Sequence, residues 1–83
     1  MPQDYTVNQL LKDLSIGREI EFEYDGVVGT ICNEKDGWIY YGGNFGNSAY
    51  YSSGEELVNS HKIKESILIN LFKRKEVKVT TIF

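Results

Sequence analysis

The fold is decided by residues 18–32, which read REIEFEYDGVVGTIC. Over residues 18–24 apolar and acidic residues alternate, which is the pattern of a β-strand with one buried face and one wet face. The apolar positions are Ile20, Phe22 and Tyr24, and the acidic positions are Glu19, Glu21 and Glu23. The next two residues, Asp25-Gly26, favour a hairpin turn, because a type I′ turn needs a positive φ at both central positions. We therefore expect an antiparallel hairpin whose second strand covers residues 27–32.

Further strand signals extend this hairpin into a sheet. A turn at residues 34–37 leads into the aromatic run at residues 38–41, which predicts a third consecutive strand. Residues 49–52 indicate a short fourth strand. Residues 76–83 alternate again and predict a closing strand. One of its faces carries Val77, Val79, Thr81 and Phe83, and the other carries Lys78, Thr80 and Ile82.

Three segments have helical patterns. Thr6 and Gln9 form a capping box before an amphipathic stretch at residues 7–14, and Gly17 is placed to end that helix. A second capping box, Ser53 with Glu56, starts a helix that we expect to reach about Asn59. Apolar residues at helical spacing predict a further helix over residues 63–72, although its β-branched residues are weak helix formers.

This element order, α-β-β-β-(β)-α-α-β, predicts a single α+β domain over residues 1–83. Its antiparallel sheet would have about four to five strands, with two or three short helices on one face. The opposite face of such a sheet can remain in contact with water. A chain of 83 residues and 9.5 kDa has room for no second domain.

Charge is distributed unevenly along the chain. The net charge is −3, but residues 1–56 carry ten acidic and three basic residues, whereas residues 57–83 carry two acidic and six basic ones. Nucleic-acid binders gain most of their affinity from neutralising phosphates with a dominant basic patch. Direct nucleic-acid binding as the main role is therefore disfavoured. The short basic run at residues 73–75 is expected to complement a helix C-terminus.

Reactive side chains are few. One Cys and one His exclude a disulfide scaffold and a zinc knuckle, and we expect no metal, no cofactor and no catalytic residue. Cys32 is expected to be a small core residue of a strand, and His61 to be exposed at a helix boundary. An unpaired cysteine fits a reducing compartment, and no targeting or membrane-spanning segment is visible, so we expect a cytoplasmic protein without a membrane partner.

Two features are candidate binding sites. The first is the acidic row of Glu19, Glu21 and Glu23, which is either a solvated strand exterior or an acidic docking surface. A catalytic carboxylate pair or a metal site is the remaining alternative, and the even spacing on a solvated face speaks against it. The second is an aromatic cluster around the glycine-rich residues 42–48, which is either core or a recognition surface. The cluster consists of Trp38, Tyr40, Tyr41, Phe45, Tyr50 and Tyr51.

Residues 10–26, LLKDLSIGREIEFEYDG, resemble the opening of a family of small uncharacterised proteins of Gram-positive bacteria and their phages. The family layout of helix, hairpin, Trp-bearing strand, two helices and closing strand is similar over most of the chain. The family carries no activity to transfer, and residues 42–48 depart most from its layout. In size and charge alone the chain is also similar to anti-defence inhibitors such as anti-CRISPR proteins.

Together these patterns favour a non-enzymatic binding module, such as an inhibitor encoded by a phage or mobile element. Its acidic row would select a basic surface on a host or cellular protein, for example one that processes nucleic acids, and its aromatics would act as anchors. The anchors expected are Trp38, Tyr40, Phe45, Tyr50 and Tyr51. The alternative is a small-ligand binder in which these aromatics stack a nucleotide base or another ring under the glycine-rich loop. The closing strand could also pair with its copy in a homodimer.

Overall fold

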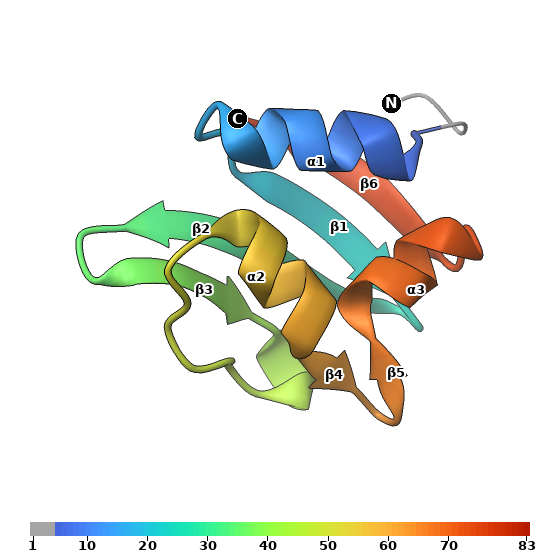
Figure 1. The fold of residues 1–83 in the computed structure, drawn as a ribbon. Helices are drawn as coiled ribbons and strands as arrows, with labels where there is room; N and C mark the ends of the chain where they lie inside the picture. Colours follow the sequence, from blue (N-terminus) through green and yellow to red (C-terminus); the bar gives the residue numbers. More distant parts are fainter. Residues whose placement is uncertain (1–4) are drawn as a thin grey trace.

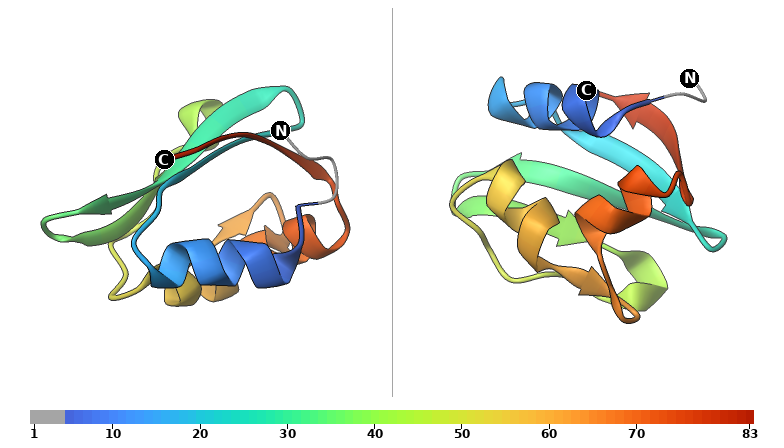
Figure 2. Two further views of the ribbon diagram at one scale, coloured as in Figure 1. Left: turned by 90° about the horizontal axis from the view of Figure 1, so that it is seen from above. Right: turned by 45° about the vertical axis from the view of Figure 1, so that its right-hand side comes forward.

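Three α-helices cover one face of a four-stranded antiparallel sheet in the computed structural model, which describes residues 5–83 (Figures 1 and 2). The strand order is β3-β2-β1-β6, and a small second sheet consists of β4 and β5. The strands are β1 (Ile20–Tyr24), β2 (Val27–Glu34), β3 (Gly37–Tyr41), β4 (Lys62–Ile63), β5 (Ser66–Ile67) and β6 (Val77–Ile82). The helices are α1 (Val7–Ser15), α2 (Gly54–Ser60), α3 (Leu68–Lys73) and the 3₁₀ helix η1 (Gly43–Phe45). The predicted α+β class is confirmed.

The central hairpin follows the sequence pattern closely. Asp25 and Gly26 have φ values of 53° and 80°, as a type I′ turn requires. The register pairs Ile20 with Ile31 and so places the apolar side of β1 against the helices. β2 runs two residues beyond its predicted end and reaches Glu34.

The first helix begins and ends where its capping signals predict. The Thr6 side chain accepts a hydrogen bond from the Gln9 backbone N–H, and the Gln9 side chain accepts one from the Thr6 backbone N–H. After the cap residue Ile16, Gly17 takes a φ of 93°, a left-handed conformation that ends a helix. Leu10 and Leu14 are buried in the core.

Two sequence expectations are wrong in the second half of the chain. Residues 63–72 are not one helix, because Lys64 has a positive φ of 59° and forms a turn between β4 and β5, and α3 begins only at Leu68. The β-branched residues Ile63 and Ile67 lie in these two short strands. Residues 49–52 form no strand either. Only Tyr51 pairs there, in an isolated bridge to Trp38.

A β-bulge interrupts the predicted alternation of β6. Phe22 pairs with Val79, but Glu21 pairs with Thr81 rather than Thr80, so β6 contains one extra residue. Beyond the bulge the two faces of β6 are exchanged. Simple alternation predicts that Ile82 lies on the same face as Lys78. Instead, Ile82 pairs with Ile20 and packs against the core.

Candidate functional site

The sheet face opposite the helices carries most of the acidic residues of β1 and β2. We call it the open face, and we assign residues to it from the strand alternation and the register. Its residues are Glu19, Glu21, Glu23, Val28, Thr30, Cys32, Glu34, Ile39, Tyr41 and Lys78. Four carboxylates and one ammonium group therefore share this face, which makes it strongly acidic.

Neighbouring strands orient two members of the predicted acidic row. Glu21 Oε1 accepts hydrogen bonds from the Thr80 hydroxyl at 2.7 Å and the Thr81 hydroxyl at 3.2 Å. Glu19, which directly precedes β1, accepts one at Oε2 from the backbone N–H of Asn33 at 2.8 Å. Because these bonds hold the carboxylates in place, little side-chain entropy remains to be lost when a partner binds them.

A fourth carboxylate, Glu34, lies between two tyrosines. The hydroxyl of Tyr41 donates to one of its oxygens at 2.7 Å, and that of Tyr50 donates to the other at 3.0 Å. The hydrogen bond to Glu34 is the main cause that raises the pKa of both tyrosines. Glu34 lies outside the predicted acidic row, because the strand predicted over residues 27–32 ends at Cys32. Continuing the alternation by one more pair of residues would have found it.

The predicted aromatic anchors separate into buried and exposed groups. Trp38 and Tyr40 face the helices and are only 8% and 0% exposed, so they belong to the core and cannot contact a partner directly. Phe45 and Tyr51 are half-buried and pack against the same core. Tyr50, at 46% exposure, is the predicted anchor that reaches solvent. For Trp38 and Tyr40 the structure therefore agrees with the alternative that the aromatic cluster is core, because a small domain uses aromatic side chains to bury apolar area.

The glycine-rich segment closes the outer edge of β3. Gly42 donates its N–H to the Gly46 carbonyl at 3.1 Å, around the 3₁₀ turn η1. The chain then returns along β3, where the Ser48 hydroxyl accepts the N–H of Tyr40 at 2.8 Å. Tyr51 exchanges two backbone hydrogen bonds of 2.8 Å with Trp38. This segment is therefore part of the sheet's edge.

Cys32 and His61 lie on opposite sides of the sheet. Cys32 is on the open face, half-buried rather than in the core, and burial together with Glu19 and Glu34 raises the pKa of its thiol. His61 ends α2 on the helix side, half-buried rather than exposed as expected, with its ring 5.5 Å from that of Tyr40. The sheet separates the two groups, so they form no nucleophile–base pair.

His61 makes the stability of the fold depend on pH. Burial lowers the pKa of His61 below its ordinary value of 6.5. Near and below pH 6.5 the unfolded chain therefore binds more protons at His61 than the folded protein does. The free energy of unfolding decreases as the pH falls through this range. We expect the melting temperature to fall between about pH 7.5 and about pH 5.5, and His61→Gln to remove most of that fall. Thermal melts of both proteins at the two pH values measure this, and an equal fall in the variant would contradict it.

Neither a membrane helix nor a metal cluster occurs among residues 5–83. None of their helices is long and apolar enough to cross a membrane, and no group of three or more His, Cys, Asp or Glu side chains is placed to hold a metal ion. The chain was also compared with known proteins. No protein-family model, no curated protein and no solved structure matches it.

Proposed function

We propose that the protein is a non-enzymatic binding module that docks its open face onto a basic surface of a partner protein. The observation that carries this proposal is the concentration of four carboxylates and a single lysine on the one sheet face that no α-helix covers (Figure 2). Complementary charge steers association and selects the partner. Hydrogen bonds within the protein already hold three of the four carboxylates.

Apolar and aromatic contact area accompanies these charges. Val28 is 51% exposed near the Asp25-Gly26 turn, and Tyr50 is 46% exposed at the β3 side of the face, where it shares Glu34 with Tyr41. Tyrosines supply large contact areas at low entropic cost and are frequent in binding hot spots. We therefore propose Tyr41 and Tyr50 as the anchors, in place of the buried Trp38 and Tyr40.

The charge of this face favours one class of partner. Proteins that process nucleic acids carry basic surfaces for phosphates, and a row of fixed carboxylates can take the place of those phosphates. A module that covers such a surface would act as an inhibitor. The ligand-binding alternative has less support, because two of its ring-stacking residues are buried in the core and the glycine-rich segment is tied to β3.

Charge reversal at Glu23 tests the proposal. No hydrogen bond within residues 5–83 holds its side chain, so the change leaves the internal bonds of the other carboxylates intact. We expect Glu23→Lys to weaken capture of a partner from host lysate roughly tenfold or more, because it places like charge against a basic surface. Captured proteins are quantified by mass spectrometry at low and at physiological salt.

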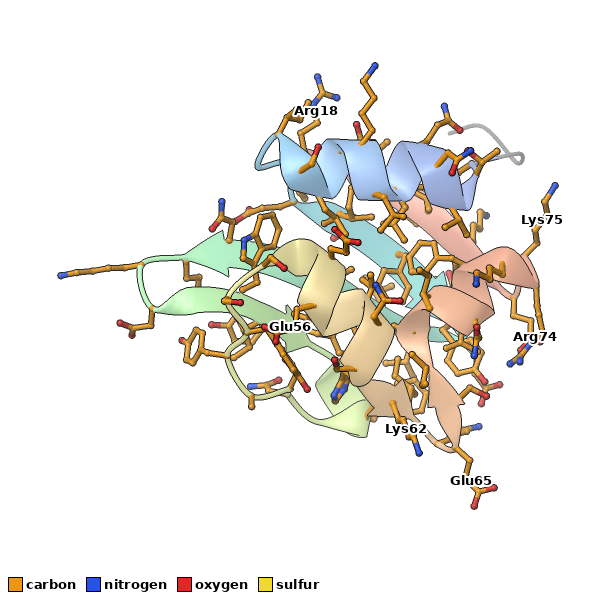
Figure 3. The ribbon with its side chains drawn as sticks, viewed as in Figure 1. Arg18, Glu56, Lys62, Glu65, Arg74 and Lys75 are labelled. Atoms are coloured by element: carbon orange, nitrogen blue, oxygen red, sulfur yellow. The ribbon has the colours of Figure 1, made fainter. Side chains whose placement is uncertain are left out.

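Glu65→Lys is the matched control, because it changes the net charge equally at the tip of the β4–β5 turn, where Figure 3 shows Glu65 projecting away from the body of the protein. A partner lost with Glu23→Lys, weakened by Glu23→Gln and retained by Glu65→Lys supports the proposal. Equal retention by all variants, or no partner at either salt concentration, refutes it. Circular dichroism verifies that each variant is folded.

A further inference from the structure

The main sheet has two edges, and they differ in what covers them. The edge of β3 pairs with residues of the segment that follows it, through Asn47 and Tyr51. The edge of β6 has no backbone hydrogen bond to any other segment among residues 5–83. An uncovered edge strand offers its N–H and C=O groups to another chain.

The register shows which groups β6 offers. Tyr24 and Val27 flank a two-residue turn and exchange hydrogen bonds, so the polar backbone groups of Tyr24 point toward β2. Because backbone groups alternate in direction along a strand, the N–H and C=O of Phe22 also point toward β2. Val77 and Val79 lie opposite Tyr24 and Phe22, and their own N–H and C=O groups therefore point outward to the free edge.

A groove of about 580 Å³ follows this edge. On the helix side of the sheet its wall is apolar, formed by Tyr5, Phe72, Val77 and Val79. A strand added beside β6 would place every second side chain into this groove. Within residues 5–83 the edge therefore combines unpaired backbone groups with a recess that is apolar on its helix side. The rest of its lining is polar and consists of Glu23, Asp25, Lys75, Glu76, Lys78 and Thr80.

We propose that the occupant of this edge is a second copy of the chain, with β6 paired antiparallel to β6 of its partner about a two-fold axis at Val77. In that register each Val77 lies opposite the other and enters the groove next to Tyr5. Each Glu76 lies opposite the Lys78 of the second copy, so the interface contains two pairs of opposite charge. Glu76 also contacts Arg74 in its own chain at 2.6 Å, but both side chains are nearly half exposed, and such surface pairs contribute little.

Charge and backbone geometry disfavour the neighbouring registers. An axis at Lys78 would place two lysines directly opposite each other, which is destabilising. An axis at Val79 or beyond would require regular pairing through the bulge at Thr80 and Thr81, where the extra residue disrupts the outward ladder. Because the edge of β3 is covered, pairing at β6 closes the assembly at two copies.

The dimer would present two open faces on one side. A two-fold axis perpendicular to a continuous sheet keeps the helix-free faces of both copies on the same side. Two adjacent acidic faces would bind a partner with two basic sites more tightly than one face does. The dimer itself rests only on the β6 edge, so its failure leaves the docking proposal unaffected.

Reciprocal charge exchange tests the register. Glu76→Lys places lysine opposite Lys78, and Lys78→Glu places glutamate opposite Glu76, so each single variant should dimerise roughly tenfold or more weakly than the unmodified protein. The double variant Glu76→Lys/Lys78→Glu restores opposite charges and should dimerise as the unmodified protein does. A mixture of the two single variants should form a heterodimer, because each supplies what the other lacks. Sedimentation equilibrium and native mass spectrometry measure these species without any partner.

Lys62→Glu and Glu65→Lys, on β4 and its turn, are the matched controls for charge and should leave the dimer unchanged (Figure 3). A monomer at every attainable concentration overturns the proposal. So does a dimer that both single variants retain, or one that the mixture and the double variant fail to restore. Thermal melts verify that loss of the dimer is not loss of the fold.

Discussion

Tyr40→Ala is expected to lower the free energy of unfolding by about 3–5 kcal/mol, the cost of removing a large buried aromatic. Tyr40 is fully buried, and its ring stacks on Phe22 with centroids 5.5 Å apart and planes 11° from parallel. A domain of this size shifts its melting temperature by about 4–8 °C per kcal/mol, so the melting temperature of the variant should fall by about 12–40 °C. Urea titration followed by the fluorescence of Trp38 measures the change.

Tyr40→Phe is the matched control and should behave in the opposite way. The Tyr40 hydroxyl is buried without a hydrogen-bond partner among residues 5–83, and the same burial raises the pKa of the phenol to about 12. Leaving a polar group buried and unpaired costs about 1–3 kcal/mol, so its removal should be neutral or stabilising. A loss of stability with Tyr40→Phe comparable to that with Tyr40→Ala would show that the hydroxyl does have a partner.

Gly42→Ala and Gly29→Ala should both destabilise the protein, because the Tyr40 ring packs directly against both glycines and leaves no room for a Cβ. A Cβ at Gly29 would lie 2.6 Å from the ring, and one at Gly42 would lie 2.6 Å from the ring and 2.4 Å from the Gly46 carbonyl oxygen. Overpacking of this kind costs about 1–3 kcal/mol, with Gly42→Ala expected at the upper end because a backbone oxygen cannot rotate away. Urea unfolding of each variant measures the loss.

A double-mutant cycle identifies the cause of that loss. In a Tyr40→Leu background the ring atoms that a Cβ at Gly29 meets are absent, so most of the penalty of Gly29→Ala should disappear. The penalty of Gly42→Ala should persist, because the Gly46 carbonyl remains. The neighbouring Val28→Ala, at an exposed site, should change stability by less than about 0.5 kcal/mol. Equal penalties for Gly29→Ala in both backgrounds would disprove the contact.

The elements predicted correctly are those whose signals are local. The capping box of Thr6 and Gln9, the Asp25-Gly26 turn and the alternation of β1 each depend on residues a few positions apart. The helix predicted over residues 63–72 was wrong, because apolar residues four positions apart suit both a helix and a tight hairpin followed by a helix. The positive φ at Lys64 decides between them, and a lysine does not signal it in sequence.

The candidate site was predicted only in part for a related reason. Alternation placed Glu19, Glu21 and Glu23 on one face, and the structure keeps them there beside Glu34. The aromatic cluster could not be divided from sequence, since both faces of residues 38–41 carry aromatic side chains. Packing of α2 against β3 made the Trp38 and Tyr40 side the core and left Tyr41 on the open face.

The amino-acid sequence by itself determined the α+β class, the central hairpin and the acidic side of its first strand, because turn chemistry and period-two alternation act between near neighbours. Only the tertiary structure decided which aromatics are buried, that Glu34 joins Tyr41 and Tyr50, and that the bulge in β6 turns Ile82 toward the core. These outcomes depend on contacts between segments far apart in the chain. The burial of a side chain depends on which segments pack over it, and a local sequence pattern does not contain that information.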